Sequence, residues 1–217
     1  MKKIIEKFFE STNEKGKNKL FQLLDSIPQF NDNINYLVAG SWAIEILSEK
    51  RLKHDDIDLI ILDQFPVYLD DAIFSEEKCN GIIPLDTEYF KLFNEKCIYE
   101  NKIIYVPSIN FQICMKLIGQ LQKRLPKRAL KQLNYLLDSY KINTQISKEE
   151  ILYILSNTTP NTLNYKLLTD KIVNAILLYS KDKNKANKKF IEIHNEINKA
   201  LRNEFDNGTY PIKISNK

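Results

Sequence analysis

The chain has 217 residues, of which 43% are hydrophobic and 11% aromatic, a composition that favours a folded globular protein over a disordered one. Its 32 basic and 28 acidic residues give a formal charge of only +4, so a nucleic-acid role requires a local basic patch. No segment reads as a transmembrane span or a signal peptide, and the cysteines form no C-x-x-C pair. We therefore expect a cytoplasmic protein with reduced thiols and no membrane association.

The first half of the chain alternates between helical and strand-like patterns. Apolar residues at helical spacing predict two short helices within residues 3–30. A strand is expected at 36–39, a helix at 42–47, and a strand that carries aspartates within 54–62. Further along the chain we expect a helix within 67–79 and two strands, at 81–86 and at 102–106. The pattern is typical of a mixed α/β (α+β) domain with a short sheet flanked by helices.

From residue 109 onward the strand signal disappears. Helices are expected at 113–121, after Pro126, and at 151–155 behind a capping-box sequence that begins at Ser147. Two long helices follow within 161–180 and 186–205. The shift in pattern predicts a domain boundary, with a mixed domain at residues 1–124 and an all-α helical bundle at residues 125–217.

Two aspartates at alternate positions open the strand within 54–62. Residues two apart in a strand point to the same face, so Asp56 and Asp58 are expected side by side, opposite Ile57 and Leu59. Adjacent like charges are costly unless a cation lies between them, and clustered carboxylates suit Mg²⁺ or Mn²⁺. The pair therefore predicts a metal site whose shell is completed by substrate phosphates.

A Gly-Ser turn lies between the strand at 36–39 and the helix at 42–47. Gly40 allows close approach of the backbone to an anion, and the Ser41 hydroxyl is able to donate a hydrogen bond. Backbone N–H groups at the start of the next helix favour phosphate. Gly40 and Ser41 are thus predicted nucleotide-binding residues that face the Asp56 and Asp58 pair.

These residues resemble a known superfamily. Residues 38–44 (VAGSWAI) followed by 54–60 (HDDIDLI) look like the signature of the nucleotidyltransferase superfamily, the DNA polymerase beta-like fold. The same stretches are similar to the adenylyltransferases that inactivate aminoglycosides and lincosamides. In this chain Gly-Ser replaces the Gly-Gly of those enzymes, and Glu45 replaces their aspartate.

A second resemblance concerns residues 106–128. Residues 106–108 (VPS), 115–117 (MKL) and the basic stretch that includes Arg124 and Arg128 look like the AbiEii-type nucleotidyltransferases of abortive-infection and toxin–antitoxin systems. Those proteins often join the catalytic domain to a helical bundle, and their place in toxin–antitoxin systems implies an antitoxin as a possible partner. The acidic members of a later motif of that group are missing at residues 127–132 (KRALKQ).

The resemblance implies an enzyme that transfers NMP from a nucleoside triphosphate to an acceptor and releases pyrophosphate. Asp56 and Asp58 would hold Mg²⁺ or Mn²⁺, and Lys116 would place positive charge near the phosphates. Members of the superfamily supply a third catalytic carboxylate from a later strand. Asp86 is our choice for it, with Glu88 as the alternative.

Several interpretations stay open on the sequence alone. The acceptor is an RNA, a protein or a small molecule, and the small-molecule case includes antibiotic adenylylation. A different reading is a degenerate domain that binds nucleotide or a protein partner without turnover. Trp42 is interpreted as a core residue, His54 as a surface residue, and the basic run at 181–189 as a solvated loop between helices.

Overall fold

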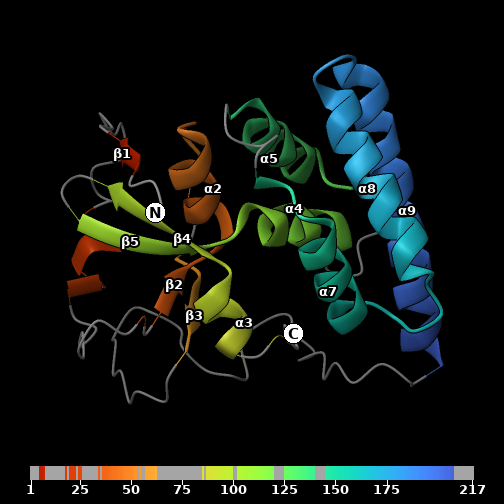
Figure 1. The fold of residues 1–217 in the computed structure, drawn as a ribbon, viewed down its shortest axis with the longest axis horizontal. Coiled ribbons are helices and arrows are strands. Elements are labelled where there is room, and N and C mark those ends of the chain that lie inside the picture. Colours follow the sequence, from red (N-terminus) through yellow and green to blue (C-terminus); the bar gives the residue numbers. More distant parts are fainter. Residues whose placement is uncertain are drawn as a thin grey trace. The chain divides into compact units, whose positions relative to one another are not determined.

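The computed structural model describes residues 5–7, 18, 20–22, 24–25, 34, 36–52, 54, 57–62, 85, 87–99, 102–119, 125–139 and 145–207. Over these residues the chain is mostly helical and carries two small sheets, as expected for an α+β protein (Figure 1). The described residues form two compact units. The first takes those from 5 to 62 and from 87 to 108, and the second takes Leu85 and those from 109 onward. The boundary at residues 124 and 125 stays a prediction.

The first unit contains both sheets. In one of them β4 (Asn94–Tyr99) lies between β1 (Ile5–Lys7), to which it is parallel, and β5 (Lys102–Pro107), to which it is antiparallel. In the other, β2 (Tyr36–Val38) pairs antiparallel with β3 (Leu59–Ile61), and Leu37 lies opposite Ile60. The strands predicted near 36, 59 and 102 are therefore confirmed.

Three elements of this unit differ from the sequence-based expectation. Residues 5–7 form β1 where a helix was expected, because pairing with β4 overrides the helical spacing of a short segment that includes β-branched residues. Neither α3 (Thr87–Leu92) nor β4 was predicted, since β4 carries polar residues among its buried ones. The elements expected at 67–79 and 81–86 lie outside the described residues, apart from Leu85.

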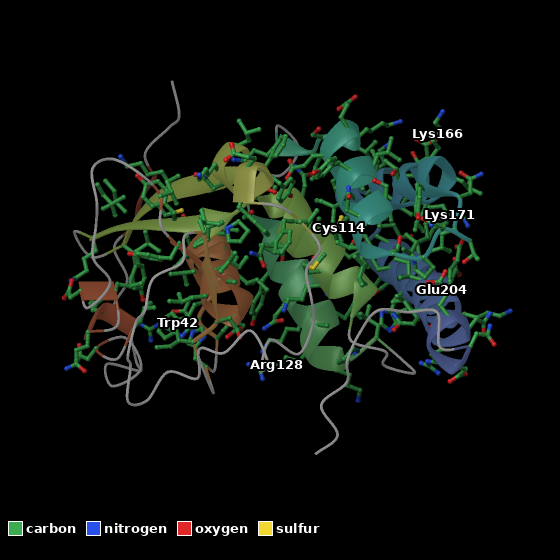
Figure 2. All side chains as sticks on the ribbon, turned by 90° about the horizontal axis from the view of Figure 1, so that it is seen from below. Trp42, Cys114, Arg128, Lys166, Lys171 and Glu204 are labelled. Carbon is green, nitrogen blue, oxygen red and sulfur yellow. The ribbon has the colours of Figure 1, made fainter. Side chains whose placement is uncertain are left out.

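The core of the first unit joins α2 (Gly40–Ser48) to strands of both sheets. Its largest side chain is Trp42, which is 2% exposed and is labelled in Figure 2, so its assignment to the core is confirmed. The buried members of this cluster are Leu20, Leu24, Tyr36, Val38, Trp42, Ala43, Ile46, Cys97, Tyr99, Ile104 and Val106. This packing fixes the start of α2 at the end of β2.

Every element described after Pro107 is a helix. The second unit contains α4 (Ile109–Ile118), α5 (Lys127–Asp138), α7 (Lys148–Thr158), α8 (Tyr165–Tyr179) and α9 (Lys183–Asp206). Helix α4 contacts α5, α7 and α9, and α8 packs against α7 and α9 (Figure 1). The basic run at 181–189 is mostly the start of α9, so its assignment to a loop was wrong, although its lysines are exposed. None of the helices described is both long and apolar enough to serve as a transmembrane span.

The predicted N-cap of α7 is confirmed, but its capping box is completed from α4. Ser147 Oγ accepts a hydrogen bond from Glu150 N at 3.2 Å. Asn110 Oδ1 accepts from Ser147 N at 3.3 Å. Asn110 Nδ2 in turn donates to Glu150 Oε2 at 2.7 Å and to Gln145 O at 3.0 Å. One buried amide thus links the start of α4 to the start of α7.

The other end of α4 is capped by side chains of α9. His194 is fully buried, and its Nδ1 lies 2.8 Å from Leu117 O. Asn198 Nδ2 donates to Ile118 O at 2.6 Å. Because carbonyl oxygens only accept, the His194 Nδ1 carries the hydrogen of that bond. These contacts satisfy terminal carbonyl groups that α4 is unable to pair within itself.

Cys114 lies inside the second unit, and its sulfur is visible among the helices in Figure 2. Burial raises the pKa of this thiol well above its usual range, and the negative charge of Glu150 adds to the effect. Because the thiolate is the reactive form, we expect iodoacetamide to label Cys114 at least ~100-fold more slowly in native protein than in denaturant, even near pH 9. Mass spectrometry of a Cys79→Ser/Cys97→Ser variant measures this; comparable rates in both conditions would contradict it.

Candidate functional site

The site begins where β2 passes into α2, at a glycine with a left-handed backbone. Gly40 has φ +59°, a conformation that residues with a Cβ rarely adopt. A Cβ built on Gly40 would lie 1.8 Å from Asp58 Oδ2 and 2.8 Å from Asp58 Cγ. The Asp58 carboxylate therefore occupies the space beside the Gly40 Cα, and the absence of a side chain at residue 40 makes this contact feasible.

Asp58 reaches this position because β3 begins immediately after it. Ala39 N donates to Asp58 O at 2.8 Å, which continues the pairing of β2 with β3 by one further bond. Asp58 is exposed, whereas its neighbours Ile57 and Leu59 pack against the core cluster. The side chains thus alternate between two faces at residues 57–59, as the strand pattern predicts. The result is a solvent-accessible carboxylate at the start of α2.

The first turn of α2 offers backbone donors beside this carboxylate. The N-cap residue Ala39 makes no side-chain capping bond, and the first intrahelical bond runs from Ala43 N to Ala39 O at 3.2 Å. The N–H groups of Gly40, Ser41 and Trp42 precede that bond and have no acceptor within the helix. Together with the helix dipole they favour an anionic group.

The Ser41 hydroxyl already has a partner on the protein. Its Oγ lies 2.9 Å from His54 Nδ1, and His54 Nε2 lies 2.6 Å from Glu45 Oε2. A carboxylate only accepts, so Nε2–H donates to Glu45. In the neutral imidazole Nδ1 is then the acceptor, and the Ser41 hydroxyl donates its hydrogen to His54. The donors that remain at the start of α2 are accordingly its backbone N–H groups.

The side chain of His54 is buried, so its interpretation as a surface residue was wrong. Its side chain is only 4% exposed, and the ring stacks on Trp42 with 3.7 Å between centroids and 8° between planes. The sequence did not reveal this contact, because residues 42 and 54 are joined by a polar stretch that reverses the chain. Glu45 offered the better signal, as a single charged residue within the apolar run 42–47.

The predicted site residues fall into three groups. Gly40, Ser41 and Asp58 lie together in the first unit. Lys116 lies on α4 in the second unit and is partly buried. Asp56 and Asp86 lie outside the described residues, so their placement stays a prediction.

Glu88, the alternative third acid, lies on the exposed side of α3. Its Oε1 is 3.3 Å from Lys91 Nζ, an ion pair within one helical turn. An exposed pair of this kind contributes little to stability, so Glu88 needs no other partner for the fold. The choice of Asp86 as the third catalytic carboxylate therefore stays a prediction.

Asp58 has the chemistry that Mg²⁺ or Mn²⁺ requires. It is an exposed carboxylate beside Gly40 at the start of α2, and Mg²⁺ usually takes one or two protein carboxylates and completes its shell with water and phosphate. Within the part of the chain that the structure describes, no group of three or more His, Cys, Asp or Glu residues is placed to hold a metal ion. The fit therefore depends on Asp58 together with a second carboxylate.

Comparison with known proteins adds no relative. The chain matches no family model, no curated protein and no solved structure. Its chemistry is therefore interpreted from the geometry around Gly40 and Asp58. That geometry brings a carboxylate and an anion-binding helix start to one point, an arrangement suited to a metal-bound phosphate ligand.

Proposed function

We propose that the chain is a Mg²⁺-dependent nucleotidyltransferase that transfers NMP from a nucleoside triphosphate to an acceptor. The observation that carries the proposal is the Asp58 carboxylate seated against Gly40 at the start of α2. A carboxylate and a triphosphate repel each other at one helix start unless they share a cation. The sequence signature over residues 38–44 and 54–60 supports the same conclusion.

In this proposal Asp58 and Asp56 hold Mg²⁺ or Mn²⁺, which supplies charge neutralisation of the triphosphate when bound. The N–H groups of Gly40 and Ser41 bind phosphate oxygens. The hydroxyl of the acceptor attacks the α-phosphorus, and pyrophosphate leaves. Asp86, or Glu88 in its place, takes the proton of that hydroxyl.

The proposed architecture is a nucleotidyltransferase-type domain with a short mixed sheet, followed by a helical bundle. The sheet formed by β1, β4 and β5 contains both parallel and antiparallel pairs, which supports the first part. The helices described from residue 109 onward support the second. The acceptor is an RNA, a protein or a small molecule, and an antitoxin-like protein is the proposed partner.

Calorimetric titration with ATP and GTP tests the metal–nucleotide site. We expect binding that requires Mg²⁺ or Mn²⁺ and that weakens at least about tenfold in Asp58→Asn and in Asp56→Asn. Asp170→Asn is the matched control, because Asp170 is an exposed aspartate on α8 that pairs with Lys148. Equal nucleotide binding by wild type and both site variants would overturn the proposal.

Turnover has a separate assay. Wild-type protein is incubated with labelled NTPs and a panel of tRNA, aminoglycoside, lincosamide and protein acceptors, including the chain itself. A labelled product that is lost in Asp58→Asn identifies the acceptor class. Binding of nucleotide without a labelled product would favour the non-catalytic module, and an aminoglycoside or lincosamide product would favour antibiotic adenylylation.

A further inference from the structure

Glu45 holds the segment that returns along α2 toward the start of this helix. It lies on the second turn of α2, is 5% exposed, and accepts two hydrogen bonds on a single oxygen. Leu52 N donates to Glu45 Oε2 at 2.8 Å, and His54 Nε2 lies 2.6 Å from the same atom. A buried carboxylate is costly unless such donors surround it, so Leu52 and His54 are held against α2 through Glu45.

His54 is held from three directions. Glu45 bonds Nε2, Ser41 Oγ bonds Nδ1 at 2.9 Å, and the Trp42 indole stacks on the ring face. A ring with both nitrogens paired and one face covered has a single orientation. The backbone at residue 54 is therefore fixed against the first two turns of α2.

The sequence that carries the predicted metal-binding aspartates follows His54 directly. Its last residue, Asp58, is held by a second set of contacts. Asp58 O accepts from Ala39 N, and the Asp58 side chain lies against Gly40. His54 and Asp58 are thus both held at the first two turns of α2. His54 is held through its side chain, and Asp58 through the backbone bond from Ala39 N. The position of the backbone at His54, four residues before Asp58, thus depends on the contact between Glu45 and His54.

We infer that Glu45 is a positioning residue that acts through His54 to hold the Asp58 carboxylate against the start of α2. The inference rests on the proposed function. Glu45 itself contacts neither metal nor phosphate in it. Its effect is on the affinity for the ion and on the environment of Trp42, the single tryptophan of the chain.

The test measures Mn²⁺ affinity by electron paramagnetic resonance, together with thermal melts and Trp42 fluorescence. Glu45→Ala is expected to bind Mn²⁺ about tenfold more weakly than wild type while it stays folded, with a shifted Trp42 emission. Glu49→Ala is the matched control, since Glu49 is exposed at the end of the same helix, and it should retain wild-type affinity. If Glu45→Ala fails to fold, Glu45→Gln takes its place, with an expected loss of at least about threefold.

Two substitutions of His54 separate its two bonds. The amide nitrogen of His54→Gln stands in for Nε2 and is expected to keep the Glu45 bond and Mn²⁺ affinity within about twofold of wild type. The amide of His54→Asn is shorter and reaches only the position of Nδ1. This variant therefore loses the hydrogen bond to Glu45 and should bind Mn²⁺ as weakly as Glu45→Ala. Tighter binding of Mn²⁺ by His54→Asn than by His54→Gln would overturn the inference.

Failure of this inference is distinguishable from failure of the proposed function. If wild type binds Mn²⁺ and Asp58→Asn does not, while folded Glu45→Ala binds as tightly as wild type, then Glu45 has no positioning role. If Asp58→Asn binds Mn²⁺ as tightly as wild type, the metal site itself is wrong, and the inference falls with it.

Discussion

Replacement of Gly40 with alanine is expected to abolish the proposed Mg²⁺-dependent nucleotide binding and to lower the free energy of unfolding by about 2 kcal/mol or more. The left-handed backbone alone costs an alanine about 1–2 kcal/mol. The added Cβ would also lie 1.8 Å from Asp58 Oδ2, so the carboxylate has to leave its position. Urea denaturation gives the stability, and calorimetry with ATP gives the affinity.

Gly119→Ala is the matched control for this experiment. Gly119 has φ +60°, and a Cβ there would lie 3.0 Å from His194 Cε1 in the second unit. It therefore carries a similar backbone cost, and we expect lower stability with unchanged metal and nucleotide affinity. In an Asp58→Ala background the stability cost of Gly40→Ala should shrink, because the colliding carboxylate is absent. Nucleotide binding by Gly40→Ala at wild-type affinity would contradict the prediction.

Asn110→Ala is expected to lower the free energy of unfolding of the second unit by about 3 kcal/mol. The substitution removes a donor to the buried Glu150 carboxylate and the acceptor of Ser147 N–H. Each buried polar group that loses its partner costs about 1–3 kcal/mol. The measurement is urea denaturation followed by circular dichroism.

Asn157→Ala provides the comparison for Asn110→Ala. Asn157 is an exposed asparagine near the end of α7 whose amide donates to Tyr153 O at 2.8 Å. Exposed substitutions of this kind usually change stability by less than about 0.5 kcal/mol. Losses of equal size in the two variants would show that the Asn110 contacts do not stabilise the second unit.

The spacing of apolar residues was sufficient to predict those helices and strands whose buried side chains recur at the period of the element itself. Strand β2, helix α2 and the long helices α8 and α9 lie where apolar spacing predicts them. Strand β4 was missed because its sequence, Asn94 to Tyr99, mixes charged and apolar residues, and its pairing with β1 and β5 decides its conformation. A tertiary contact of this kind leaves no signal in the spacing of one segment.

The candidate site also contains residues that the sequence predicted and a contact that it did not. Gly40 and Asp58 were predicted from local motifs, and the structure places them in contact. The pairing of Glu45 with His54 was not predicted, because it depends on a chain reversal after α2, where Glu49 adopts φ 61°. A left-handed glutamate has no sequence signature, unlike a glycine at such a position. His54 therefore read as an isolated polar residue.

The polar caps at both ends of α4 have a consequence for how the second unit folds. The partners of Asn110 lie 35 to 40 residues later in the chain, and those of Leu117 and Ile118 lie 77 and 80 residues later. Contacts of such separation raise contact order and require large loops to close before they stabilise the helix. Helix α4 therefore reaches its final stability only after α9 has docked, and a chain that ends before His194 would leave it incomplete.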